Sequence, residues 1–166
     1  EAHCVRHLMT DFERVGDRNQ SLEFARRTLK NLEFIVSSRG NGEDVHVVTQ
    51  AVVSLLGLLI FPWERSAIAA VKKEKLPVLS SQGWPKWDMT GRRVVEVGDL
   101  VKLLRDSTAH GKVAFDSDSP EPANVMVTFS NHPNGQSEAD WSGKIRGDHL
   151  IEFCQRFLSS LIGHLE

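Results

Sequence analysis

Apolar residues recur at every third or fourth position in several long stretches of the chain, with charged residues between them. This spacing is typical of amphipathic helices. It predicts helices over residues 22–36, 44–61 and 94–109. A short further helix is predicted to begin at Pro62, because proline is tolerated in the first turn of a helix.

Beyond residue 111 the pattern changes to a period of two, which is typical of strands. Three short runs, VAF, NVMVTFS and ADWSGKIR, alternate in this way and are separated by turn-forming residues. They predict a small antiparallel hairpin or three-stranded meander within residues 112–146. Residues 147–165 then return to the helical period, with Asp148 as a candidate N-cap, and predict a long closing helix.

Together these patterns predict a fold of the mainly α class. The expected architecture is a helical bundle of four or five helices with a small antiparallel β insertion before the last helix. A length of 166 residues suits a single domain over residues 1–166. Residues 76–91 contain prolines, glycine and serines without a sustained period, and they are predicted to form a long surface loop or lid.

The formal net charge of −2 argues against a protein that holds nucleic acid by its overall electrostatic field. Any contact with RNA must therefore be local. The candidates are basic residues that flank the predicted loop and its tryptophans Trp84 and Trp87 in the sequence, namely Lys72, Lys73, Arg92 and Arg93. Charges interleaved with aromatic rings suit single-stranded RNA, and the alternative is an ordinary solvated surface.

The longest apolar run, residues 51–62, is shorter than the roughly 20 residues that span a membrane, so it is predicted to be a core helix. Cys4 and Cys154 stand far apart and no secretory signal is evident, so we expect a protein without disulfides in the cytoplasm. His3, Cys4 and His7 supply at most half of a tetrahedral zinc site. No later pair completes it, so no metal or cofactor is predicted.

The predicted helix over residues 94–109 runs into the stretch LLRDSTAHG, which contains Arg105, Asp106, His110 and Gly111. Two interpretations of this stretch are open. In the first, the helix macrodipole favours His110, and Gly111 forms a left-handed C-cap. In the second, the stretch carries chemistry, because histidine titrates near neutral pH and the planar fork of arginine suits phosphate oxygens.

An apolar helix that carries Arg105, the polar Asp106 and then His110 resembles the R-x4-H motif of the HEPN superfamily. The GLLIFPWE segment ahead of it is similar to short prokaryotic HEPN nucleases of toxin and defence loci. The resemblance implies a metal-independent endoribonuclease acting on RNA, with Arg105 and His110 catalytic and Asp106 orienting one of them. It also implies an antitoxin or another regulatory protein as a partner. Lys112 stands where partner-controlled members commonly have a tyrosine, and it is predicted to contact phosphate instead.

Cleavage of RNA without metal needs a base for the 2′-hydroxyl, an acid for the departing 5′-oxygen and a group that neutralises charge on the phosphorane. One histidine does not readily serve as both base and acid. We therefore expect a homodimer that brings two copies of Arg105 and His110 into one composite cleft. The alternative is a non-catalytic HEPN-like module that binds nucleotide, RNA or protein, in which Arg105 pairs with a nearby carboxylate and His110 caps its helix.

Overall fold

A four-stranded sheet and the helices packed on it form the part of the chain that the structure, a computed structural model, describes: residues 23, 26–34, 37, 48–54, 67–133 and 137–165. Residues 26–34 and 48–54 are helical. The elements that follow are, in chain order, η1 (Ala67–Ala70), α3 (Leu76–Ser81), β1 (Asp88–Gly91), α4 (Val97–Ala109), β2 (Val113–Phe115), η2 (Pro122–Asn124), β3 (Met126–Asn131), β4 (Trp141–Arg146) and α5 (Gly147–Leu165).

The strands form one antiparallel sheet in the order β1-β4-β3-β2. The predicted meander of β2, β3 and β4 is confirmed. Its alternation also shows which face of the sheet is covered, because Val127 and Phe129 of β3 and Trp141 and Ile145 of β4 are buried while their neighbours are not. The covered face packs against helices, with α4 on β3 and α5 on β4.

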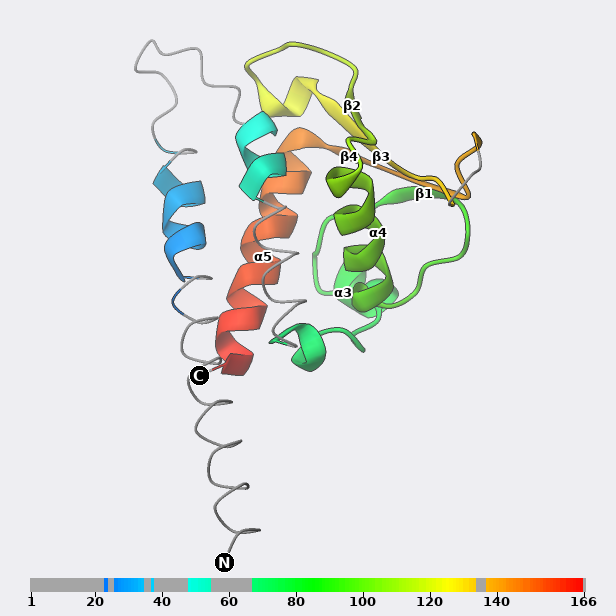
Figure 1. Ribbon diagram of the computed structural model, residues 1–166. Coiled ribbons are helices and arrows are strands. Elements are labelled where there is room, and N and C mark those ends of the chain that lie inside the picture. The colour runs from blue at the N-terminus through cyan, green and yellow to red at the C-terminus, as the bar shows by residue number, and fades with distance from the viewer. Residues whose placement is uncertain are drawn as a thin grey trace, which may run out of the picture.

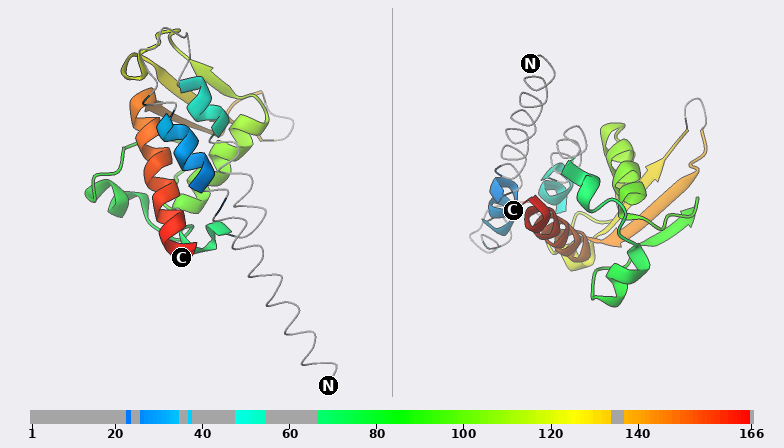
Figure 2. Two further views of the ribbon diagram at one scale, coloured as in Figure 1. Left: turned by 90° about the vertical axis from the view of Figure 1, so that its left-hand side faces the viewer. Right: turned by 90° about the horizontal axis from the view of Figure 1, so that it is seen from below.

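The two long helices carry the apolar stripes that the sequence predicts. In α4 the buried residues include Val97, Val101 and Leu104. Helix α5 covers the predicted range of residues 147–165, and its stripe is buried from Ile151 to Leu161. Figures 1 and 2 show that α5 and the helical segment 48–54 both lie between the helical segment 26–34 and α4.

The predicted mainly α bundle with a β insertion is wrong: the fold is a mixed α and β structure. The sheet has a fourth strand, β1, which precedes α4 in the chain and pairs with β4. The sequence of β1 shows no alternation of apolar and polar residues, because only Met89 among its four residues packs against the core. Its pairing is determined by the long strand β4 rather than by a pattern of its own.

The prediction of a long loop or lid over residues 76–91 is also wrong. Its first part is the helix α3, which starts with Pro77 in its first turn, and its last part is β1. Pro77 lies at the beginning of α3 and Gly91 at the end of β1, so these residues mark the ends of regular elements and do not indicate a loop. Gly91 makes the sharp exit from β1 with a φ of 82°.

Several predicted helices are described only in part. Within the predicted helices 22–36 and 44–61, residues 26–34 and 48–54 are helical. Pro62 and the GLLIFPWE segment lie outside the described residues, and the predicted helix that begins there is represented by the 3₁₀ helix η1. Within the described residues, no helix has both the length and the apolar character needed to cross a membrane.

Candidate functional site

The C-terminal end of α4 carries the predicted catalytic residues, and its cap determines where His110 lies. His110 is the C-cap, and Gly111 follows with a φ of 64°. The Gly111 N–H donates to the Thr108 carbonyl (3.1 Å) and the Lys112 N–H donates to the Ser107 carbonyl (2.7 Å). These two bonds form a Schellman motif, which ends the helix sharply and turns the chain toward β2.

Arg105 lies one turn before the cap and is oriented by its neighbour. Its Nε and Nη2 atoms donate to Oδ1 of Asp106 at 3.0 and 2.8 Å. The side chains are 23 % and 28 % exposed, so the pair is partly shielded from solvent. A guanidinium held in this way keeps one plane and still faces the surface at the end of the helix. Asp106 thus orients Arg105, one of the two roles predicted for it.

His110 is exposed, and its main chain rather than its ring is engaged by the helix. The backbone N–H donates to the Asp106 carbonyl at 3.1 Å. In the part of the chain that the structure describes, no group hydrogen-bonds the imidazole. An exposed imidazole at this position is open to accept or donate a proton.

The structure divides the predicted RNA-binding residues among three places. Lys112 is exposed beside the cap, and its carbonyl accepts from the Ser130 N–H at 3.0 Å. Lys72 and Lys73 lie at the opposite end of α4, where the Lys72 carbonyl accepts from the Gly98 N–H. Because a 13-residue helix separates the two ends, they are about 20 Å apart.

Arg92 and Arg93 form the third group, directly after β1. Both are exposed, and the Arg92 N–H donates to the Asp140 carbonyl at 3.0 Å, which fixes the turn at this corner of the sheet. This corner belongs to β1, at the edge of the sheet opposite to β2. The five predicted basic residues therefore do not form one patch with the end of α4.

The tryptophans of the predicted loop pack inward instead of presenting free rings. Trp84 and Trp87 make edge contacts with Phe153 of α5, with ring centroids 5.8 and 5.3 Å apart, and Trp87 also packs against Phe129. They line a cavity of about 220 Å³ together with residues of α3 and β1. Their main contribution is therefore to the core.

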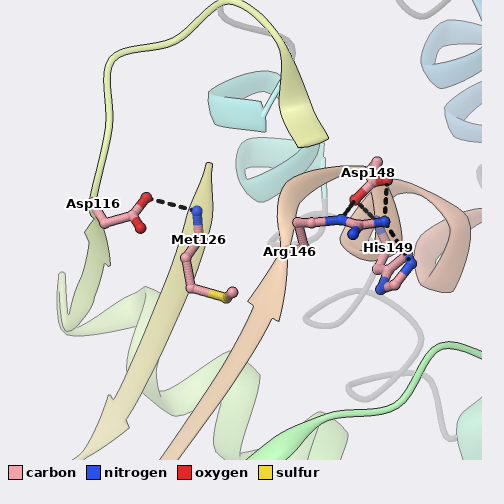
Figure 3. Close-up of polar contacts among 5 residues, drawn as sticks. All are labelled: Asp116, Met126, Arg146, Asp148 and His149. Atoms are coloured by element: carbon pink, nitrogen blue, oxygen red, sulfur yellow. Dashed lines mark hydrogen bonds and ion pairs between the residues drawn. The ribbon is translucent and has the colours of Figure 1, made fainter. Parts of the chain in front are cut away.

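A second arginine, aspartate and histidine lie together where β4 meets α5, and the sequence reasoning missed them (Figure 3). Arg146 donates from Nε and Nη2 to the two carboxylate oxygens of Asp148, at 2.6 and 2.7 Å, and from Nη2 to Nε2 of His149 at 2.9 Å. The hydrogen bond from Arg146 lowers the pKa of Asp148. The available signal was the sequence RGDH at a strand-to-helix junction.

Other chemistry finds less support in the described residues. Cys154 is fully buried, and burial raises the pKa of its thiol to about 12, so it does not act as a nucleophile near neutral pH. No group of three or more histidine, cysteine or acidic side chains within the described ranges is placed to hold a metal ion. The candidates His3, Cys4 and His7 lie outside those ranges.

Comparison with known proteins identifies the class of this chain as HEPN, which confirms the predicted superfamily. The chain belongs to one particular HEPN family, since the family model described as HEPN pEK499 p136 matches residues 9–164. No curated protein and no solved structure matches it. Membership of a HEPN family is consistent with a nuclease or with a nucleotide-binding module.

Proposed function

We propose that this HEPN protein is a metal-independent endoribonuclease of toxin or defence type. The observation that carries the proposal is the end of α4, where an exposed His110 follows, on the same helix end, an Arg105 that Asp106 holds in one orientation. This arrangement supplies a proton-transfer group and an oriented cation at the same end of α4. It needs no metal ion to activate the nucleophile.

His110 is suited to proton transfer in both halves of the reaction. As a base it takes the proton of the 2′-hydroxyl, whose oxygen then attacks the adjacent phosphorus. As an acid it protonates the departing 5′-oxygen, so the products carry a 2′,3′-cyclic phosphate and a 5′-hydroxyl. Arg105 neutralises the charge that builds up on the phosphorane oxygens.

A homodimer completes the site in this proposal. A single His110 would have to be base and acid in the same turnover, whereas two copies related by a two-fold axis divide these tasks. Cleavage should then depend on protein concentration below the dimer dissociation constant. Full activity from a protein that sizes as a monomer would refute the composite cleft.

One observation favours a second candidate, a HEPN module that binds RNA, nucleotide or protein without cleaving. Nε and Nη2 of Arg105 both donate to Asp106 of the same chain, and His110 is the C-cap of α4. These are the contacts that purely structural roles of Arg105 and His110 would require. In this case substitution of His110 would leave every RNA-dependent property unchanged. The two candidates therefore differ in the behaviour of one side chain.

The deciding experiment is cleavage of total cellular RNA by purified protein in excess EDTA, with wild type and His110→Ala compared side by side. Because the His110 ring is exposed and its hydrogen bonds to the helix come from the backbone, the variant should fold normally. We expect loss of activity by about 100-fold or more. His164→Ala, a second exposed histidine at the end of α5, is the matched control and should cleave like wild type.

Analysis of the product ends completes the test. Cyclic phosphate ends produced by wild type and by His164→Ala, but not by His110→Ala, support the proposal. Arg105→Ala should lose a comparable factor, since removing one positioned charge donor costs about 100-fold or more. Equal cleavage by all four proteins would show that the activity lies elsewhere, and no cleavage by any of them would favour the binding module.

A further inference from the structure

One face of the sheet is left open by the helices. Along β4 the residues that alternate with the buried Trp141, Gly143 and Ile145 are exposed or half-exposed, and the same holds along β3. Apart from Met126, the side chains of β3 and β4 on the open face are small polar or basic, namely Thr128, Ser130, Ser142, Lys144 and Arg146. Met126, at its end, is 37 % exposed and is the one large apolar residue of β3 on that face.

The strand register aligns these side chains in rows across the sheet. The first row runs from Lys112 through Ser130 and Ser142 to Thr90. The second row runs from Ala114 through Thr128 and Lys144 to Asp88. Because neighbouring strands lie about 4.8 Å apart, each row extends for about 14 Å.

The first row begins at the candidate active site. Lys112 follows His110 by two residues, and its N–H is part of the cap that ends α4. Its carbonyl bonds to Ser130, so the same residue belongs to the helix cap and to the sheet. Val113 packs against the core, and the pleat therefore places Lys112 on the open face with Ser130 and Ser142.

The chemistry of the two rows matches the sugar–phosphate backbone of RNA. Serine, threonine and lysine side chains are common ligands of phosphate and sugar oxygens. Within the described residues, no carboxylate lies within ion-pair distance of Lys112 or Lys144, and Asp88 is the only acidic residue of the two rows. Protein interfaces, by contrast, have aromatic and apolar centres, which these rows lack.

We infer that the open face of the sheet binds the backbone of the single-stranded RNA that His110 cleaves, with Lys112 and Lys144 as its phosphate contacts. This inference rests on the proposed function and adds the path of the substrate to it. Arg146 lies next to Lys144 on this face, in the cluster with Asp148 and His149 (Figure 3). The RNA strand thus runs from the end of α4 across β3 and β4.

The test measures binding of a fluorescent single-stranded RNA to full-length protein by anisotropy over a range of salt concentrations. All proteins carry His110→Ala, so that the RNA stays intact. Loss of one phosphate contact should reduce the slope of log affinity against log salt by about 0.7 and weaken binding about fourfold at 0.15 M salt. We expect this for Lys112→Ala and for Lys144→Ala, whereas Lys144→Arg should bind like its parent.

Lys73→Ala and Lys102→Ala are the matched controls. Both lysines are exposed. Lys73 lies at the other end of α4 and Lys102 lies on the exposed side of this helix, so neither variant should change the slope of log affinity against log salt. If Lys144→Ala keeps the parental slope, or if Lys73→Ala loses as much as Lys144→Ala, the inference is overturned. The proposed function fails separately, when the protein with His110 intact does not cleave RNA.

Discussion

Gly111 is the residue at which the cap of α4 can be tested most directly. Its φ of 64° lies in the left-handed region, where an L-residue with a Cβ costs about 1–2 kcal/mol. A Cβ built at Gly111 has no atom within 4 Å, so Gly111→Ala adds no steric clash to this cost. Alanine also restricts the unfolded chain, which offsets part of the loss. We therefore expect a decrease of about 1 kcal/mol in the free energy of unfolding.

Urea unfolding followed by circular dichroism measures this decrease. Gly111→Asn should lose less, because asparagine adopts the left-handed conformation more readily. Gly163→Ala is the matched control: it also adds a Cβ with no atom within 4 Å, but within α5, where alanine should stabilise the helix by about 0.5 kcal/mol. A Gly111→Ala protein as stable as wild type would refute the left-handed cap and with it the placement of His110.

Two further predictions concern the sheet and its junction with α5. Gly143→Ala should destabilise the protein by about 1–3 kcal/mol, because the added Cβ would lie 2.5 Å from ring carbons of the buried Trp141; an unchanged urea midpoint would contradict this packing. Asp148→Asn should lower the midpoint at pH 7. Since the hydrogen bond from Arg146 holds the pKa of Asp148 below its ordinary value of 3.8, the advantage of wild type is fully present well above pH 3.8 and is lost as the pH falls through the lowered pKa. A difference that stays constant as the pH is lowered below 3.8 would refute this reasoning.

The elements that the sequence predicts well are those whose own residues determine their burial. Helix α5 has an apolar stripe over its whole length, and β4 alternates strictly between buried and open positions. Strand β1 has neither property, because one residue of four packs against the core and its hydrogen bonds come from β4. Short elements of this kind depend on their partners, so periodicity along the chain does not show them.

The candidate site is predictable in its residues but less so in its surroundings. The order of Arg105, Asp106, His110 and Gly111 along one helix end is a local property, and the cap and the ion pair form as the sequence indicates. Which lysines share a surface with them depends on where distant segments meet. Lys73, a sequence neighbour of the tryptophan loop, lies far from the site. The strand register, in contrast, places Lys144 on the same open face of the sheet as Ser130, which bonds to Lys112.

The sheet and the charge of the chain together explain why the open face would matter for the proposed ribonuclease activity. A protein with a net charge of −2 does not attract RNA by its overall field, so the phosphate contacts of the proposed ribonuclease would have to be concentrated near the reacting bond. The cap at Gly111 joins the proposed catalytic end of α4 to the sheet within two residues, and Lys112 belongs to both. A contact on the sheet is therefore held rigidly relative to His110. In the proposed reaction, the energy of that contact would serve to align the 2′-hydroxyl with the bond that breaks.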